Sequence, residues 1–217
     1  EYVDRLCTVE MRPPGPWPRG VTHKLYESVR EKLGSPLTLL AAEKLVENLR
    51  KDDNVIITTG VGFLPYLPYG ETDGPLGAAG LARALEVGLG ARPIFVVGER
   101  DIPPVKACCQ AAEISIHSYE IAQKKTHSGV VIPFPVEDEE GKEFSKEIIE
   151  KYDPKALISV ERLGPNVKGI IHSIIGMDLT PRLGKVHYLF DEARRRKILT
   201  IGVADGGNEI GCGIIVE

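Results

Sequence analysis

The stretch that decides the fold is Asn54-Val55-Ile56-Ile57-Thr58-Thr59-Gly60. Its β-branched residues form a short apolar run that lacks the spacing of an amphipathic helix, and Gly60 closes the run. A run of this kind is typical of a strand that is buried on both faces, as the strands of a parallel sheet are. Similar runs follow at residues 93–98, 156–160 and 199–203, and less regular ones at 114–116 and 130–132.

Helical patterns separate these predicted strands, at residues 74–89, 105–112, 142–152 and 188–197. Two more helices are predicted before the first strand, at residues 22–33 and 36–50. Strands that alternate with helices form right-handed βαβ units and a mainly parallel sheet. We therefore expect an α/β fold, a Rossmann-like three-layer sandwich with helices on both faces of the sheet.

The length of 217 residues predicts a single α/β domain over residues 1–217. Residues 1–20 are expected to be irregular, because Pro13-Pro14-Gly15-Pro16-Trp17-Pro18 suits neither a helix nor a central strand. The charged stretch 135–141 is expected to be a solvated loop. The sequence ends shortly after a strand–loop unit, which is compatible with a truncated C-terminus.

The composition narrows the classes of partner and location. A net charge of −4 provides no basic footprint for nucleic acid. No apolar run approaches the ~18 residues that span a bilayer, so no membrane partner is expected. Four cysteines without metal-ligand or disulfide spacing indicate thiols in a reducing cytoplasm. Plentiful Lys, Glu and Pro with scarce Asn and Gln are a weak sign of a thermophilic source.

Two acidic, glycine-containing turns suggest where the chemistry lies. Glu71-Thr72-Asp73-Gly74 follows the loop after the first strand, and Asp205-Gly206-Gly207-Asn208-Glu209 follows the last strand. Ligands of open α/β sheets bind at the carboxyl ends of the strands. Carboxylates gathered there repel one another unless protons or a cation neutralise them. Clusters of Asp and Glu without Cys or His favour a hard cation, Mn²⁺ or Mg²⁺.

A third acid, Glu161, ends another predicted strand at the same edge of the sheet. Arg162 beside it is predicted either to bind an anionic substrate or simply to pair with Glu161. Each turn also has an ordinary structural reading: Asp73 as a helix N-cap, and residues 205–209 as an Asx-type turn. We favour the functional reading, and we predict Glu71, Asp73, Glu161, Asp205 and Glu209 as metal ligands.

Other residues of these loops are predicted to act on a small anionic metabolite. The predicted catalytic residues are Glu71, Asp73 and Asp205. Glycines allow the backbone to approach a ligand closely, and successive N–H groups can bind an anion. The predicted substrate-binding residues are Thr59, Gly60, Thr72, Arg162, Gly206, Gly207 and Asn208.

The acidic motifs also carry a family resemblance. Glu71-Thr72-Asp73-Gly74-Pro75, Ser159-Val160-Glu161-Arg162 and the segment from Gly202 to Gly211 together resemble the D-glutamate cyclase-like C-terminal domain family. The three motifs occur in the family's order over nearly the whole chain. The resemblance implies conversion of D-glutamate to 5-oxo-D-proline with loss of water.

Three functions remain open at this point. Our first hypothesis is a divalent-metal-dependent hydrolase of a small phosphate ester, because a carboxylate-only site suits that chemistry. In it, Gly206, Gly207 and Asn208 would hold the phosphate. The second hypothesis is D-glutamate cyclisation, with Arg162 holding one substrate carboxylate. The third is a metal- or metabolite-binding module without its own activity. The sequence also leaves a homo-oligomer open.

Overall fold

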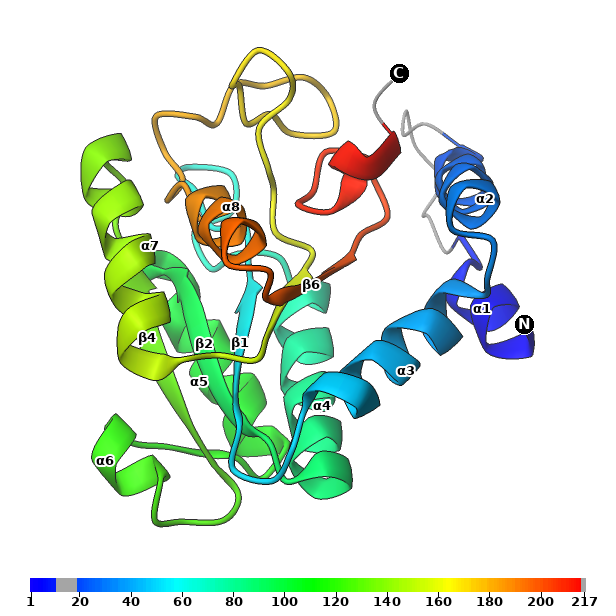
Figure 1. The fold of residues 1–217 in the computed structure, drawn as a ribbon. Coiled ribbons are helices and arrows are strands. Elements are labelled where there is room, and N and C mark those ends of the chain that lie inside the picture. The colour runs from blue at the N-terminus through cyan, green and yellow to red at the C-terminus, as the bar shows by residue number, and fades with distance from the viewer. Residues whose placement is uncertain (11–18, 216–217) are drawn as a thin grey trace.

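The computed structural model describes residues 1–10 and 19–215 (Figure 1). Its centre is a six-stranded sheet in the order β3-β4-β2-β1-β5-β6, and every neighbouring pair is parallel. The strands are β1 (Asn54–Thr59), β2 (Arg92–Gly98), β3 (Ser115–Ile116), β4 (Ser128–Phe134), β5 (Ala156–Val160) and β6 (Leu199–Val203). The predicted α/β fold with a parallel sheet is confirmed.

The strand order places a topological switch point between β1 and β5. From β1 the chain builds the sheet toward β2, and it later returns to the other side of β1 with β5 and β6. Thr59 pairs with Val160, and Val160 pairs with Val203, so these three strands end at one level. A switch point at the carboxyl ends of the strands is where open α/β sheets bind ligands.

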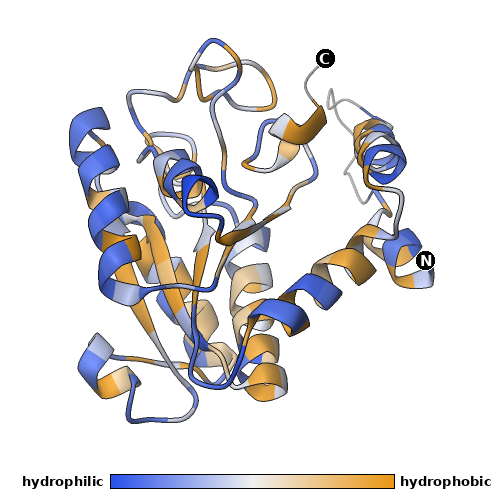
Figure 2. Cartoon of the chain, in the orientation of Figure 1, coloured by the Kyte–Doolittle hydropathy of each residue, from blue (hydrophilic) through white to orange (hydrophobic). Residues whose placement is uncertain are grey.

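Helices cover both faces of the sheet. One face packs against α4 (Asp73–Leu89), α5 (Ile102–Ala111) and the end of α3 (Leu37–Asn48). The other packs against α6 (Tyr119–Ala122), α7 (Asp138–Tyr152) and α8 (His187–Arg195). Residues of β1 alternate between the two layers, since Val55 and Ile57 join the first core and Ile56 joins the second. Figure 2 shows the strands as the apolar centre, with hydrophilic residues outside.

A smaller apolar cluster stabilises the loops above the carboxyl ends of the strands. It joins the loop after β1 to the long segment between β5 and α8. Its buried members are Val61, Phe63, Leu163, Ile171, Leu179 and Leu183. These loops therefore have a core of their own, which fixes the surroundings of the switch point.

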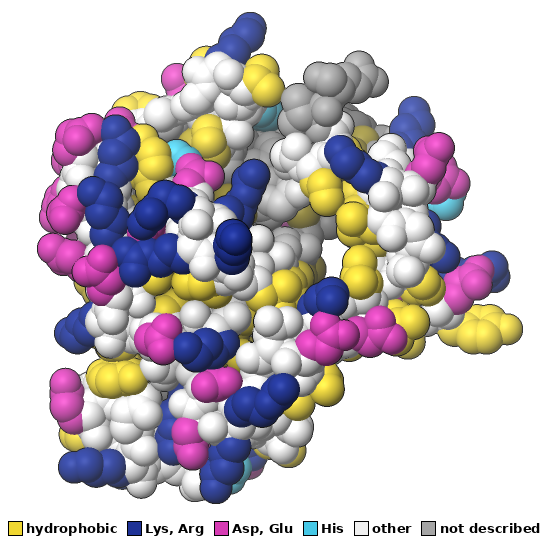
Figure 3. Space-filling model, in the orientation of Figure 1, with side chains coloured by type: hydrophobic (Ala, Val, Ile, Leu, Met, Phe, Trp, Pro, Cys, Tyr) yellow, Lys and Arg dark blue, Asp and Glu magenta, His cyan; other side chains and the backbone are white. Residues whose placement is uncertain are grey.

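The N-terminal part of the chain forms a helical arm beside the sheet (Figure 1). Residues Tyr2–Cys7 form the helix α1, followed by α2 (Val21–Leu33) and then α3. The expectation that residues 1–20 are irregular was therefore wrong for α1, while the proline-rich segment 13–18 lies outside the described residues. Tyr2 and Leu6 are among the exposed apolar residues of α1, and Figure 3 shows apolar side chains on the surface of the arm.

The buried side chain of Asp4 holds α1 against α2 and α3. Its carboxylate accepts hydrogen bonds from the backbone N–H groups of Leu37 and Thr38, at 2.6 and 2.9 Å, and from the Thr38 hydroxyl. The Tyr26 hydroxyl donates a further bond of 2.9 Å. One side chain therefore joins α1, α2 and the start of α3.

Other predicted boundaries needed smaller corrections. Helix α7 begins at Asp138, so part of the expected loop 135–141 is helical, because acidic residues suit a helix N-terminus. Strand β4 is longer than its predicted apolar run. Within residues 1–10 and 19–215, no helix has both the length and the apolar character needed to cross a membrane.

Candidate metal centre

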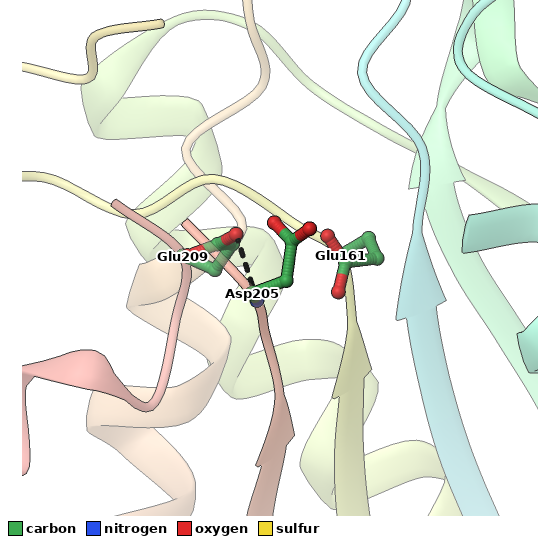
Figure 4. A group of neighbouring side chains, drawn as sticks. All are labelled: Glu161, Asp205 and Glu209. Atoms are coloured by element: carbon green, nitrogen blue, oxygen red, sulfur yellow. Dashed lines mark hydrogen bonds between the residues drawn. The ribbon is translucent and has the colours of Figure 1, made fainter. Parts of the chain in front are cut away.

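Three carboxylates meet at the carboxyl ends of β5 and β6, next to the switch point. Glu161 follows β5 directly, while Asp205 and Glu209 lie in the loop after β6. One carboxylate oxygen from each lies within 4.8 Å of the others. Figure 4 shows the Asp205 carboxylate between Glu209 and Glu161, with Glu161 approaching from the neighbouring strand. Because β5 and β6 end at the same level, the two loops present their acids to one point.

Glu161 occupies an unusual backbone conformation. Its φ is 53°, in the left-handed region that residues other than glycine rarely adopt. Its N–H donates a 3.0 Å hydrogen bond to the carbonyl of Val203, which extends the pairing of β5 with β6. Burial, together with the charges of Glu209 and Asp205, raises the pKa of Glu161 to about 9. A neutralising partner is therefore required if Glu161 is to be ionised at neutral pH.

Glu209 closes its own loop. Its Oε1 accepts hydrogen bonds from the N–H groups of Asp205, at 3.2 Å, and Gly206, at 2.8 Å. Its Oε2 accepts one from Gly207 at 2.8 Å, where the φ of 91° suits glycine. We expected Gly206, Gly207 and Asn208 to hold a substrate anion, but the N–H groups of Gly206 and Gly207 are already used by Glu209. Asn208 also differs from that expectation, since its side-chain amide donates a 2.7 Å hydrogen bond to the backbone carbonyl of His172.

Glu71 and Asp73 lie near this cluster without joining it. Among the described residues, the group whose ligand atoms converge consists of Glu161, Asp205 and Glu209 alone. Glu71 is half-buried, and burial with the nearby charges of Asp73 and Asp205 raises its pKa to about 7. Asp73 is exposed at the start of α4, where its Oδ1 accepts a 2.9 Å bond from the N–H of Gly74.

The remaining predicted residues after β1 have distinct surroundings. Thr59 is fully buried, and its hydroxyl has no hydrogen-bond partner among the described residues. A Cβ at Gly74 would lie 2.6 Å from this hydroxyl and 3.2 Å from the Cβ of Glu161. Helix α4 therefore begins directly against the site. Thr72 is exposed at the N-cap of α4 and makes no side-chain capping bond.

Arg162 does not face a substrate. It is fully buried, and its guanidinium donates to the carbonyls of Gly60 and Gly184 and to the carboxylate of Asp101. We therefore correct the expectation that it binds an anionic ligand. The sequence analysis missed Asp101, which lies in the short 3-10 helix Glu99–Asp101 directly after the buried strand β2.

The donor set fits a hard divalent cation. Oxygen ligands from carboxylates are those that Mg²⁺ and Mn²⁺ prefer, and the converging group contains no His or Cys. Burial, followed by the charges of the neighbouring carboxylates, raises the pKa values of Glu71 and Glu161. A bound cation would relieve the repulsion between these carboxylates. The donor set suits Mg²⁺ and Mn²⁺ equally.

Comparisons with known proteins place the chain in a family. No curated protein sequence matches it significantly. Among solved structures, a universal stress protein crystallised in complex with cAMP is 18% identical, with a TM-score of 0.33. That alignment covers 71% of this chain and 98% of the stress protein. The sequence model of the D-glutamate cyclase-like C-terminal domain matches residues 19–217, so the chain belongs to that family.

Proposed function

We propose that this chain is a divalent-metal-dependent enzyme that cyclises D-glutamate to 5-oxo-D-proline with loss of water. The observation that carries the proposal is the convergence of Glu161, Asp205 and Glu209 at the carboxyl ends of β5 and β6 in a chain from this family. In the reaction, the amino nitrogen attacks the side-chain carboxyl carbon. A C–N bond forms, a C–O bond breaks, and the departing oxygen leaves as water.

The cluster supplies the charges that this reaction needs. Glu161, Asp205 and Glu209 would hold Mn²⁺ or Mg²⁺, which when bound polarises a carboxyl oxygen. An anionic site also attracts the ammonium group of the substrate and holds it beside the reacting carboxyl group. Proximity of the two groups lowers the entropic part of the barrier.

Glu71 is the residue that we assign to proton transfer. The amino group must lose a proton before its nitrogen can attack. With a pKa raised to about 7, the Glu71 carboxylate can accept that proton near neutral pH and release it afterwards. Asp73 contributes by its charge, which follows burial as the second cause of the raised pKa of Glu71.

Phosphate ester hydrolysis is a second candidate, supported by the acid-only donor set. One feature of the site argues against it. Gly206 and Gly207, two of the three residues expected to hold the phosphate, donate their N–H groups to Glu209 instead. A binding module without its own activity is the third candidate.

One set of assays separates the three candidates. The metal-stripped protein is incubated with D-glutamate, with and without Mn²⁺ or Mg²⁺, and 5-oxo-D-proline is measured by chiral chromatography. An aryl phosphate is tested in parallel. We expect 5-oxo-D-proline only with metal, and its formation should fall to the enzyme-free background in Asp205→Asn.

The matched control is Asp191→Asn, which changes an exposed aspartate on α8 and should leave the rate unchanged. Metal-dependent phosphate release without 5-oxo-D-proline would replace our proposal with the hydrolase. Metal binding without either product would favour the binding module. Cyclisation that persists in Asp205→Asn would remove the acidic cluster from the mechanism.

A further inference from the structure

The residue after Glu161 belongs to a buried ion pair. The side chains of Arg162 and Asp101 are 1% and 2% exposed, and Nη1 of Arg162 lies 3.2 Å from Oδ2 of Asp101. Nη1 also donates a 2.6 Å bond to the carbonyl of Gly60, and Nη2 donates a 2.9 Å bond to that of Gly184. Arg162 thereby connects the segments that follow β1, β2 and β5 with the segment before α8.

Glycine backbone packs closely around the Asp101 side chain. A Cβ at Gly60, Gly62 or Gly98 would lie 2.5, 2.8 or 2.8 Å from the nearest atom of the Asp101 side chain. Two backbone segments, the loop after β1 and the end of β2, therefore approach this side chain so closely that only glycine fits at these three positions. Such a close fit leaves the ion pair little freedom to move.

The backbone of Arg162 holds both sides of the carboxylate cluster. Glu161 directly precedes it in the left-handed conformation, with φ at 53°. The carbonyl of Arg162 accepts a 2.8 Å hydrogen bond from the N–H of Ile210, the residue after Glu209. A further bridge pairs Leu163 with Glu209. A disfavoured φ persists only where the surrounding structure determines it, and the anchored Arg162 provides that constraint.

We propose that Asp101 and Arg162 are positioning residues, whose buried ion pair fixes Glu161 and Glu209 in the arrangement that binds the cation. The inference rests on the proposed function, because it assigns the ion pair a role at that metal centre. It also explains why the arginine beside an acidic site points away from it. Groups behind metal ligands orient them, and changing such groups typically weakens metal binding about 10–100-fold.

The test uses a double variant, Asp101→Asn with Arg162→Met. Breaking the pair by a single substitution would leave an unpaired buried charge, whereas a neutral pair of similar size avoids this. Mn²⁺ affinity is measured by electron paramagnetic resonance, together with the thermal unfolding midpoint. We expect the double variant to unfold cooperatively and to bind Mn²⁺ about 10–100-fold more weakly than the wild type.

The matched control is the pair Arg92 and Asp52, whose side chains lie 2.6 Å apart at the opposite edge of the sheet. Arg92→Met with Asp52→Asn should leave Mn²⁺ affinity within about twofold of the wild type, because this pair does not lie behind the metal ligands and cannot orient them. A folded Asp101/Arg162 double variant with wild-type Mn²⁺ affinity would overturn the positioning role.

A metal-free measurement separates this inference from the proposed function. Amide hydrogen exchange reports whether Glu161 and Ile210 lose protection in the double variant while the amides of β1 keep theirs. If the wild type itself binds no Mn²⁺, the proposed metal centre falls. Hydrogen exchange then still tests whether the ion pair holds these loops. Faster exchange confined to the residues around Glu161 and Ile210 supports that role, and unchanged exchange overturns it.

Discussion

At the scale of single residues, Glu161 combines a rare backbone conformation with strong electrostatic crowding. Its φ of 53° and its raised pKa, about 9, both indicate that the surrounding structure holds this carboxylate where it would not stay by itself. Strain of this kind concentrates at functional sites. In the metal-free chain, the burial of Glu161 and the charges of its neighbours should therefore oppose folding once Glu161 ionises.

The first prediction concerns the pH dependence of stability without metal. Folding raises the pKa of Glu161 from 4.5 to about 9, so the folded state retains a proton that the unfolded state has released. The stabilising contribution of Glu161 is therefore fully present below pH 4.5 and is lost as the pH rises through about 9. We expect the thermal unfolding midpoint of the EDTA-treated wild type to fall across this range.

Glu161→Gln should make that decline shallower, because a glutamine has no proton to lose. The control is Glu147→Gln, at an exposed position on α7, which should retain the slope of the wild type. The three proteins are compared by scanning calorimetry at several pH values. Equal slopes for Glu161→Gln and the wild type would mean that Glu161 is not crowded in solution.

At the scale of elements, α4 begins so close to the site that one methyl group should disturb it. Gly74→Ala places a Cβ 2.6 Å from the buried hydroxyl of Thr59 and 3.2 Å from the Cβ of Glu161. We expect a loss of about 1–3 kcal/mol in the free energy of unfolding, typical of overpacking.

Gly80→Ala is the matched substitution in the same helix, where a Cβ would meet nothing within 4 Å. It should stabilise the protein by about 0.5–1 kcal/mol, because alanine restricts the unfolded chain more than glycine does. Urea unfolding measures both variants. Equal effects of the two substitutions would contradict the close approach of α4 to the site.

The N-terminal arm provides another prediction at this scale. Burial alone would raise the pKa of Asp4, but hydrogen bonds from Thr38, Tyr26 and Leu37 outweigh it and lower the pKa to about 2. Asp4→Ala should cost about 1–2 kcal/mol at neutral pH, as the loss of a helix cap does. The contribution is present above pH 3.8 and is lost as the pH falls through about 2.

Urea unfolding of wild type and Asp4→Ala at neutral and acidic pH tests this dependence, with Glu31→Ala, an exposed position on α2, as the control. A stability difference that stays constant down to about pH 2 would contradict the role of the carboxylate.

The arm also touches the site, because the Thr22 hydroxyl donates a 3.2 Å bond to the carbonyl of Asp205. A variant that detaches the arm is therefore expected to make the loop after β6 more mobile.

Sequence patterns predicted the positions of strands better than the long-range contacts that stabilise α1. The strands at residues 55–59, 93–98, 156–160 and 199–203 agree with β1, β2, β5 and β6 within one residue, because strands buried on both faces need continuous apolar runs. Helix α1 was missed because its stabilising contacts come from Asp4 to residues more than 30 positions away. No local pattern reports such a contact.

The candidate site was predictable in its residue types and only partly in its geometry. Glu161, Asp205 and Glu209 follow strands that end at one edge, which sequence can indicate, and they do converge. That Glu209 would take up the N–H groups of its own loop depends on side-chain direction. Burial of Arg162 depends on Asp101, 61 residues earlier, so its pairing could not be inferred from the neighbouring Glu161.

At the scale of the whole molecule, the sheet order determines where the chemistry is placed. The switch between β1 and β5 brings the loops after β1, β5 and β6 to one edge. Periodicity alone predicted a parallel sheet but not this order, because a strand's pattern does not identify its neighbours. The convergence of acids from separate loops is thus a property of the fold, and it is the basis for proposing a metal-dependent enzyme of the D-glutamate cyclase-like family.

The most direct test of the metal centre is an equilibrium titration of the metal-stripped chain with Mn²⁺, followed by the electron paramagnetic resonance signal of the free ion. We expect the wild type to remove free Mn²⁺ from solution, Asp205→Asn to bind it at least about tenfold more weakly, and Asp191→Asn to match the wild type. Wild-type protein that leaves the free Mn²⁺ signal unchanged, or equal binding by Asp205→Asn, would contradict a shared cation between the acidic loops.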